Sequence, residues 1–188
     1  MIQKRENPLQ LKNQEAALIS RAKKDALSFG KLYDIYAPMI YRYILSRTGN
    51  IQDAQDITSQ TFLKALEMLA RYHHRGYFSA WLFSIARSKY IDHFRSRHQE
   101  EVLMTQTNLE SLPDLLTIIM ERERVSNLDH LLEQLTDEDL DLLRLRNVAE
   151  LTFAEMAEIL SKREDATKKK YYRLLARLQS QLEEENES

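Results

Sequence analysis

Helix-breaking residues are almost absent from this sequence. Glycine and proline together number six in 188 residues, whereas they make up about 12% of an average chain. Because tight turns depend on these residues, the chain has too few for a turn-rich β fold or for a disordered Pro/Gly-rich protein. Apolar side chains recur instead at helical spacing, most clearly at Tyr171, Leu174, Leu175, Leu178 and Leu182. We therefore expect an all-α protein.

Two interruptions divide the first helical block, which runs over residues 26–97. They lie near Thr48-Gly49-Asn50 and Arg75-Gly76-Tyr77, where glycine permits turn conformations, and Pro38 should kink or restart the first helix. In a later block, Thr136 and Thr152 are each followed three residues on by an acid, which is typical of helix N-caps. The predicted organisation is an N-terminal extension with a first helix (1–25), a helical domain (26–98), a linker without periodicity (99–113), a second helical domain (114–182) and an acidic tail (183–188).

The small net charge of −2 hides a strong polarity along the chain. Residues 1–98 carry 16 basic and 8 acidic side chains, residues 99–160 carry 4 and 15, and residues 161–181 carry 7 and 2. Two basic blocks therefore flank an acidic one. Such runs are either solvated helix faces or two polyanion contacts joined by a segment that avoids polyanions, and charge alone leaves both interpretations open.

Several functional classes lack their sequence signals. The best apolar stretch, Leu115–Met120, falls far short of the ~20 residues that span a bilayer, and no signal peptide is visible. With no cysteine there is no disulfide framework or Cys-based zinc site, and His73 and His74 have no further ligand at metal spacing. The sequence contains no Gly-rich phosphate loop and no Ser/His/Asp set. We expect a cytoplasmic non-enzyme without catalytic residues, cofactor, metal or membrane partner.

A helix over about residues 53–69 carries an acidic strip. At 100° per residue, one side collects small and apolar residues: Ala54, Ile57, Thr61, Ala65, Met68 and Leu69, with Phe62 at the edge. The opposite side carries Asp53, Asp56, Gln60, Leu63 and Glu67. An acidic strip around one apolar residue suits a basic partner helix. A solvated face with a stray leucine is the alternative from this helix alone.

Basic and aromatic residues alternate in the next stretch, which runs from Arg71 through the Gly76 loop to Arg97. Bases stack on aromatic rings and guanidinium groups hold phosphates, so this composition favours binding of single-stranded nucleic acid. Phe78, Trp81, Leu82 and Ile85 form an apolar stripe that we expect in the core. The loop rings expected to be free to meet bases are Tyr72, His73, His74 and Tyr77.

A capped short helix, a turn at Ser161-Lys162-Arg163 and a basic helix follow one another near the C-terminus, in the pattern of a helix-turn-helix. Opposite the apolar stripe of the last helix stand Lys169, Tyr172 and Arg173, flanked by Lys168 and Lys170. Such a face suits the major groove of duplex DNA. A plain antiparallel helical hairpin with a solvated basic face is the alternative.

Taken in order, these segments resemble a bacterial RNA polymerase sigma factor of the extracytoplasmic-function (ECF) type over roughly residues 26–182. The resemblance rests on four motifs: Phe29-x-x-Leu32-Tyr33-x-x-Tyr36-x-Pro38, Asp53-Ala54-x-Asp56-Ile57, Trp81-Leu82-x-x-Ile85-Ala86-Arg87 and Glu155-Met156-Ala157-Glu158-Ile159-Leu160. It implies two small helical domains, sigma domain 2 and the helix-turn-helix sigma domain 4, joined by a flexible linker.

The resemblance also implies a role for each surface. Core RNA polymerase would bind the acidic strip of Asp53, Asp56, Gln60, Leu63 and Glu67. The promoter's minus-ten element would be opened and held by Arg71, Tyr72, His73, His74, Arg75, Tyr77, Arg87 and Arg95. The minus-thirty-five element would be bound as duplex by Thr167, Lys168, Lys169, Lys170, Tyr172 and Arg173. Any anti-sigma factor would be a separate protein.

The expected function is therefore that of a sigma factor that directs promoter recognition, strand opening and transcription initiation. Two alternatives stay open: a stand-alone helix-turn-helix regulator, and a sigma-like regulator without initiation activity, since Ser59, Ser88 and Ala166-Thr167 depart from the family pattern. The sigma hypothesis requires accessible contact residues. Burial of Tyr72 and His74 in one merged core, with Lys169 held against protein, would contradict it.

Overall fold

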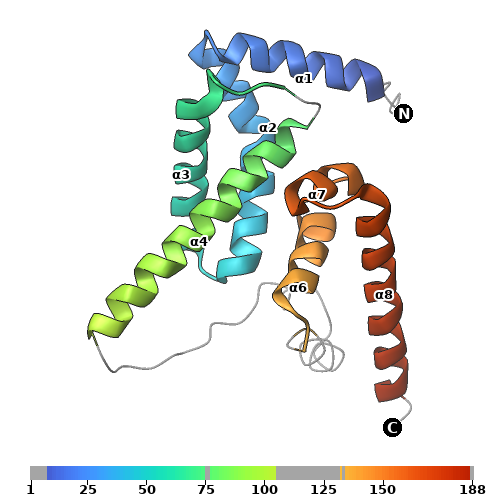
Figure 1. Cartoon of the computed structure of the whole chain (residues 1–188). Helices are drawn as coiled ribbons and strands as arrows, with labels where there is room; N and C mark the ends of the chain where they lie inside the picture. The colour runs from blue at the N-terminus through green and yellow to red at the C-terminus, as the bar shows by residue number, and fades with distance from the viewer. Residues whose placement is uncertain (1–7, 75–76, 105–131, 133, 187–188) are drawn as a thin grey trace, which may run out of the picture.

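A computed structural model of the chain describes residues 8–74, 77–104, 132 and 134–186, and all regular structure in these residues is helical (Figure 1). The helices are α1 (Pro8–Ala22), α2 (Ala26–Thr48), α3 (Ile51–Leu69), α4 (Phe78–Met104), α6 (Asp137–Leu143), α7 (Phe153–Leu160) and α8 (Glu164–Asn186). A π-helical segment, Arg144–Val148, continues directly from α6. The all-α fold expected from the sequence is confirmed.

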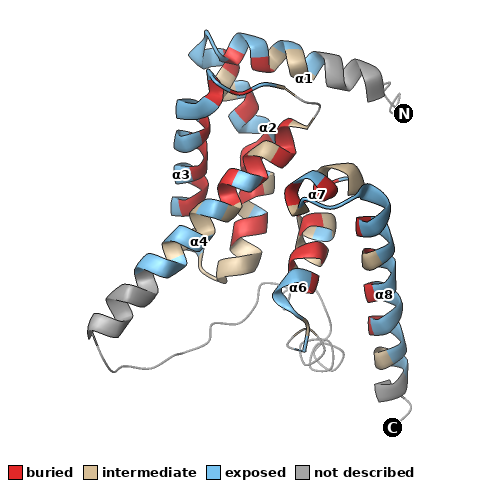
Figure 2. Cartoon of the chain, in the orientation of Figure 1, coloured by how far each residue is buried: buried red, intermediate tan, exposed pale blue. Residues whose placement is uncertain are grey.

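The helices α1–α4 form what we call the N-terminal half. Helices α2, α3 and α4 pack against one another, and α1 lies across the N-terminal end of α2 (Figure 1). Their inner faces are buried (Figure 2), and apolar burial of this kind is the main favourable term in folding. The largest fully buried side chains in this half are Ile19, Leu32, Ile40, Tyr43, Ile44, Ile57, Leu69, Phe78, Leu82 and Phe83.

Local signals set the ends of α2 and α3. The Asp25 carboxylate accepts hydrogen bonds from the backbone N–H groups of Leu27 and Ser28, and it thereby caps α2. Gly49 ends this helix with φ 61°, a left-handed conformation that glycine adopts without a Cβ clash. Asn50 then caps α3. The predicted break at residues 48–50 is confirmed, whereas Arg75 and Gly76 lie outside the described residues.

Of the two predicted effects of Pro38, a kink or a restart of the helix, the restart is wrong. The helix continues from Ala26 to Thr48 with Pro38 inside it. Pro38 has no backbone N–H to donate to the Asp34 carbonyl, and both residues are exposed. Ala37 and Ile40 on either side are buried, and this packing holds the helix together across the proline.

Helices α6–α8 with the π-helical segment form the C-terminal half. Thr136 caps α6, and Thr152 and Glu155 form the reciprocal capping box at the start of α7, both as predicted. Ser161 has φ 53° and makes the turn into α8. The core of this half contains Leu142, Leu145, Met156, Tyr171, Leu174 and Leu178. Leu175, predicted in the same stripe, is 37% exposed.

The two halves are in contact. Helix α7 packs against α4, and the π-helical segment packs against α2. Buried side chains of both halves belong to one continuous apolar cluster. Across this boundary Ser79 Oγ donates to Glu155 Oε1 at 2.5 Å, and Arg42 pairs with Glu150 at 3.4 Å. The sequence contained no signal for this association, because periodicity within a helix does not say which distant helix will cover it.

Helix α4 runs on to Met104, into the segment predicted as a linker from residue 99. The rest of that segment and the beginning of the second predicted helical domain fall on residues 105–131, outside the described residues. None of the helices described is long and apolar enough to cross a lipid bilayer.

Candidate nucleic-acid and partner interfaces

The acidic strip of α3 lies on the surface of the N-terminal half. Asp56, Gln60, Leu63 and Glu67 are exposed, and Leu63 has 63% of its surface open. Since α3 buries its opposite face against α2 and α4, the strip is held on a rigid element. Met68, predicted on the packed side, is 40% exposed and adds apolar area to the outer surface.

Asp53 differs from the rest of the strip. Its Oδ1 lies 3.2 Å from Nε2 of His93 on α4, and its side chain is only 15% exposed. The wheel placed Asp53 with the outward residues because it is at the edge of that face, where the neighbouring helix reaches it. Asp53 therefore links α3 to α4 in addition to any contact with a partner.

Beside the strip, a groove of about 410 Å³ lies between the outer sides of α2 and α3, which pack against each other. Tyr33, Pro38 and Tyr41 line it from α2, and Gln55 and Ser59 line it from α3. Tyr33 and Tyr41 were not among the predicted contact residues. Neither tyrosine is among the buried residues of α2. That position on the helix points to a groove only when α3 is known to lie alongside.

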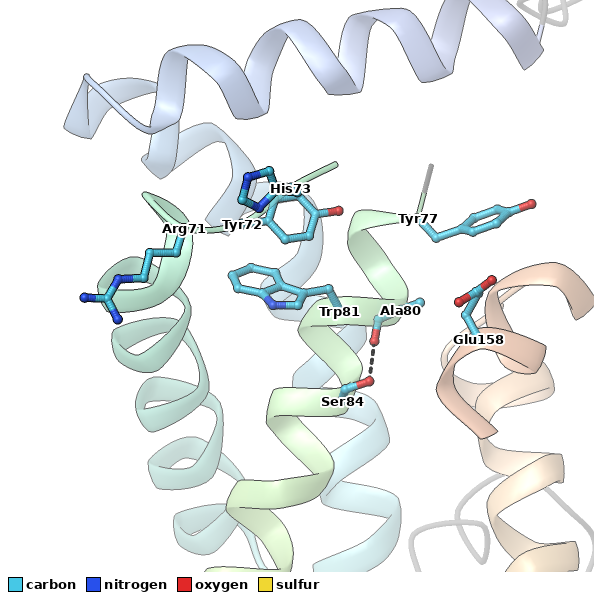
Figure 3. Close-up of a pocket in the computed structure, with 8 residues that line it drawn as sticks. All are labelled: Arg71, Tyr72, His73, Tyr77, Ala80, Trp81, Ser84 and Glu158. Atoms are coloured by element: carbon cyan, nitrogen blue, oxygen red, sulfur yellow. Dashed lines mark hydrogen bonds between the residues drawn. The ribbon is translucent and has the colours of Figure 1, made fainter. Parts of the chain in front are cut away.

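An aromatic pocket of about 370 Å³ opens between the α3–α4 connection and the start of α4. Figure 3 shows its lining residues, which are Arg71, Tyr72, His73, Tyr77, Ala80, Trp81, Ser84 and Glu158. Seven of these residues, all except Glu158, come from the predicted basic and aromatic stretch. Trp81, expected in the core, instead presents part of its ring to the pocket.

Tyr72 is buried, in contrast to its prediction as a free loop ring. Only 8% of its surface is exposed. Its ring centroid lies 4.5 Å from that of Trp81 and 5.4 Å from that of Phe78. Lys23 Nζ also donates to the Tyr72 carbonyl oxygen at 2.5 Å. A tyrosine ring next to an aromatic core gains more from packing than from solvent, so Tyr72 forms the floor of the pocket.

The other predicted loop residues have mixed environments. Arg71 and His73 are exposed, Arg95 is exposed further along α4, and Tyr77 is half-buried. His74 is half-buried, with Nδ1 at 3.3 Å from the Tyr72 hydroxyl. Arg75 lies outside the described residues. Glu158 reaches the pocket from α7 of the other half, near Tyr77 (Figure 3).

Arg87 is engaged within the protein. Its Nη2 lies 2.9 Å from Asp141 Oδ2, and its Nη1 donates to the Ile159 carbonyl oxygen at 3.4 Å. Both partners belong to the C-terminal half. In this conformation the guanidinium predicted to contact DNA instead joins the two halves.

The basic face of α8 is mostly open. Lys168, Lys169, Tyr172 and Arg173 are exposed, as a groove-binding helix requires. Thr167 is only 1% exposed, and its hydroxyl donates to the Arg163 carbonyl oxygen at 3.1 Å. Its side chain therefore supports the helix start and does not point to solvent.

Lys170 is held by acids of α6. Its Nζ lies 3.0 Å from Glu138 Oε2 and 3.1 Å from Asp139 Oδ1, and Lys162 also pairs with Glu138. Hydrogen bonds from Lys162 and Lys170 lower the pKa of Glu138 to about 2. In this conformation Lys170, predicted as a DNA contact, joins α8 to α6.

The contact residues that the sigma hypothesis requires to be accessible are only partly so. Tyr72 is buried and the halves share a core, but the partners of Tyr72 come from its own half. His74 is only half-buried and Lys169 is exposed. The described residues contain no group of three His, Asp or Glu side chains that could hold a metal ion.

The chain is similar in sequence to known proteins of one family. A family model described as Sigma-70 region 2 matches residues 32–100. The chain is 34% identical over 168 residues to the ECF RNA polymerase sigma factor BldN of Streptomyces coelicolor, an alignment covering 86% of this chain and 63% of BldN. It is 31% identical over 140 residues to the RNA polymerase sigma factor YlaC of Bacillus subtilis, covering 71% of this chain and 79% of YlaC.

A solved structure has the same fold. The structure of CnrH in complex with the cytosolic domain of CnrY matches with a TM-score of 0.64 at 19% identity, and the match covers 89% of this chain and 96% of that one. The chain therefore spans less than two thirds of BldN but nearly the full length of the structural neighbour.

Proposed function

Because this chain belongs to the ECF group of bacterial RNA polymerase sigma factors, we propose that it binds core RNA polymerase and directs it to promoters as the initiation subunit. The observation that carries the proposal is the aromatic pocket at the start of α4, which combines Trp81 of that helix with the exposed Arg71 and His73 of the α3–α4 connection. The acidic strip and the basic face of α8 support the same proposal independently.

The pocket has the chemistry needed to hold an extruded base. Trp81 and Tyr77 line it with aromatic surface, and Arg71 and His73 stand at its edge as donors to phosphate. Flipping a base out of a duplex costs a few kcal/mol, and stacking on an aromatic side chain contributes about 1–3 kcal/mol per base. One captured base can therefore offset most of its own extrusion. Tyr72 acts through packing, since its ring lies against that of Trp81.

The α3 strip is the proposed polymerase contact. Leu63 is an exposed apolar side chain with carboxylates of the same strip around it. When a partner covers Leu63, burial of its side chain supplies affinity, and the surrounding carboxylates select a basic partner. The side chains exposed for this contact are Asp56, Gln60, Leu63 and Glu67. Asp53 lies at the edge of the same strip, where it also pairs with His93.

The face of α8 is the proposed contact with duplex DNA at the minus-thirty-five element. Lys168, Lys169, Tyr172 and Arg173 are exposed on it, so they can reach phosphates and base edges in a major groove. Thr167 and Lys170 position this helix.

The proposed role needs no catalytic residue, since the polymerase carries out the chemistry, and it requires the protein to act in the cytoplasm with the chromosome. A separate anti-sigma factor stays a prediction. A stand-alone helix-turn-helix regulator would leave the acidic strip and the aromatic pocket without a use, so the alternative is not favoured.

Transcription with purified components tests the proposal. The full chain is combined with bacterial core RNA polymerase and fragmented genomic DNA from the source bacterium, and the 5′ ends of the transcripts are sequenced. We expect start sites that depend on the protein and share two upstream elements. Core polymerase alone is the control. Stable binding to the enzyme without any such start sites would instead support a sigma-like regulator that lacks initiation activity.

A further inference from the structure

A single carboxylate of the C-terminal half is buried in a cationic pocket of the N-terminal half. Asp141 on α6 has a side chain that is 3% exposed. Its Oδ1 accepts hydrogen bonds from the Tyr43 hydroxyl at 2.6 Å and from Arg47 Nη1 at 2.7 Å, and its Oδ2 lies 2.9 Å from Arg87 Nη2. Tyr43 and Arg47 come from α2 and Arg87 comes from α4, so one anion draws together three residues of the other half.

The three pocket residues are preorganised as an anion site. Burial raises the pKa of the Tyr43 phenol, so its hydroxyl remains a donor. The Arg47 guanidinium stacks 4.2 Å from the Tyr90 ring centroid, which fixes its orientation. Charge-assisted hydrogen bonds of this kind are among the stronger ones in proteins.

The carboxylate leaves part of the pocket unsatisfied. Within the described structure, Nε of Arg47 is buried and has no hydrogen-bond partner, although its Nη1 binds Asp141. Oδ2 of Asp141 is likewise buried without a hydrogen-bond partner among the described residues, although Arg87 Nη2 lies 2.9 Å away, so the carboxylate fits the donors of this pocket imperfectly. A phosphate diester shares one negative charge between two non-bridging oxygens and has two bridging oxygens as further acceptors. Guanidinium groups bind carboxylate and phosphate with the same donor geometry. A phosphate could therefore use the donor that Asp141 does not reach.

The pocket also continues the surface proposed to bind the opened strand. Ala80, Ser84 and Arg87 lie on one face of α4, and the first two line the aromatic pocket. Arg87 is seven residues beyond Ala80, about 10 Å along the helix. A strand with one base in the aromatic pocket can thus reach the Arg87 side with an adjacent phosphate.

Acidic residues of the C-terminal half cover this same face. Glu155 accepts a hydrogen bond from Ser79, Glu158 lines the aromatic pocket, and Asp141 fills the cationic pocket. Three carboxylates therefore follow the α4 face at positions where nucleic-acid phosphates would carry the same charge. These three residues belong to the acidic block of residues 99–160.

We propose that Tyr43, Arg47 and Arg87 form a binding site for a backbone phosphate of the opened promoter strand, and that Asp141 occupies this site in the closed form of the protein as an internal phosphate mimic. The inference rests on the proposed function for the identity of the strand. It adds Tyr43 and Arg47 as strand contacts, and it makes the closed form and the strand-bound form mutually exclusive.

The first test measures binding of the full chain to a fluorescent 12-nucleotide single strand of mixed sequence by anisotropy. Asp141→Asn removes the competing charge and should raise affinity by about three- to tenfold. Arg47→Gln in the Asp141→Asn background should abolish that gain and reduce the salt slope by about 0.7, the value for one phosphate on a single strand. Circular dichroism checks that each variant is folded.

Glu150→Gln is the matched control, because it removes the same charge from the same half in an exposed pair with Arg42. It should change affinity less than twofold. An equal gain in Glu150→Gln and Asp141→Asn would overturn the proposal in favour of a net-charge effect. A gain that survives Arg47→Gln would overturn the phosphate site.

A second measurement follows the separation of the halves. The chain has no cysteine, so Lys31→Cys and Ala176→Cys, both at exposed positions, provide two unique sites for a fluorescent donor and acceptor. Transfer efficiency should fall in the Asp141→Asn background and on addition of the single strand to the parent protein. Strand binding with unchanged efficiency would overturn mutual exclusion.

The outcomes separate this inference from the proposed function. If core polymerase and the protein initiate transcription but Arg47→Gln and Asp141→Asn leave initiation and strand binding unchanged, the phosphate site fails alone. If both variants alter strand binding as expected but no initiation occurs with core polymerase, the sigma function fails and the nucleic-acid site remains.

Discussion

The two halves of the molecule use their charged and aromatic residues in opposite ways. In the N-terminal half, several residues with the chemistry to meet a partner are partly occupied by packing or pairing, as Tyr72, Asp53 and Arg87 show. In the C-terminal half, the basic face of α8 is open, while acids of α6 and α7 point to Lys170 or to the other half. A residue's availability therefore depends on its position relative to the core.

The difference follows from how much each half contributes to the continuous apolar cluster. The N-terminal half buries large rings, including Tyr43, Phe78 and Phe83, and side chains near such a core are drawn into it. In the C-terminal half, α6 and α7 have only 7 and 8 residues, and both begin at a side-chain cap. Ion pairs such as that between Lys170 and Glu138 add to the contacts between its helices.

The largest expected effect concerns the aromatic core of the N-terminal half. Phe83→Ala removes a fully buried ring that packs 5.3 Å from the Tyr43 ring, and it should lower the free energy of unfolding by about 3–5 kcal/mol. Urea denaturation followed by circular dichroism measures it. Leu175→Ala, at a 37% exposed position in the other half, should cost less than about 1 kcal/mol. Similar losses would remove the contrast between the cores.

The next effect concerns the outer face of α3. Leu63→Arg should weaken binding to core polymerase by thirtyfold or more, because a buried anchor is worth about 2 kcal/mol or more, and it should leave the fold intact. Leu27→Arg is the matched control, since Leu27 is 80% exposed on α2. Surface plasmon resonance measures the affinity of each variant for core polymerase. An equal loss of affinity in both variants would contradict the proposed docking face.

A comparison within α8 tests which lysines are available. Lys169→Ala combined with Arg173→Ala should flatten the salt dependence of duplex promoter binding by about two counterions. Lys170→Ala should leave that slope nearly unchanged and instead reduce stability, because it frees Glu138 and Asp139 from their partner. Holoenzyme titrations at several salt concentrations give the slopes. An equal slope change for Lys170→Ala would return this lysine to the DNA contact.

The smallest effect is a dependence of stability on pH in the C-terminal half. The pKa of Glu138 is lowered from 4.5 to about 2 by its lysine partners, so the unfolded state binds more protons between these values. The stabilisation is then present above about pH 5 and is lost as pH falls toward 2. Because Glu138 is half-exposed, solvent screening keeps the effect below about 1 kcal/mol.

Urea denaturation of the wild type and of Glu138→Gln at pH 6 and at pH 3 provides the measurement. The wild type should be the more stable of the two at pH 6, and the gap should narrow at pH 3. A gap that is constant with pH would mean that the side chain acts through packing and not through its charge.

Several features of the fold were predictable because they depend on neighbours in sequence. The capping box of Thr152 and Glu155, the turn at Gly49 and the buried stripe of α3 all involve residues within one or two helical turns. The exposed part of the acidic strip and Lys168, Lys169 and Arg173 were predicted for the same reason, since a helical wheel separates a helix's two sides.

Other features involve contacts over long sequence distances. Tyr43 and Asp141 are 98 positions apart, and Arg87 and Ile159 are 72 apart. No local pattern marks such pairs, so the sequence could not predict that Arg87 is held by the other half. The continuation of α2 through Pro38 belongs here too, because the packing of its neighbours outweighs a local helix breaker.

The amino-acid sequence by itself determined that the chain is helical, where most of its helices begin, and which sides of them are charged. Only the tertiary structure decided which of those charges face solvent, which face one another, and how the acidic block meets a cationic pocket of the other half. The physical reason is that helix periodicity arises from bonds four residues apart, whereas burial of Asp141, Tyr72 and Lys170 depends on helices brought together from distant parts of the chain.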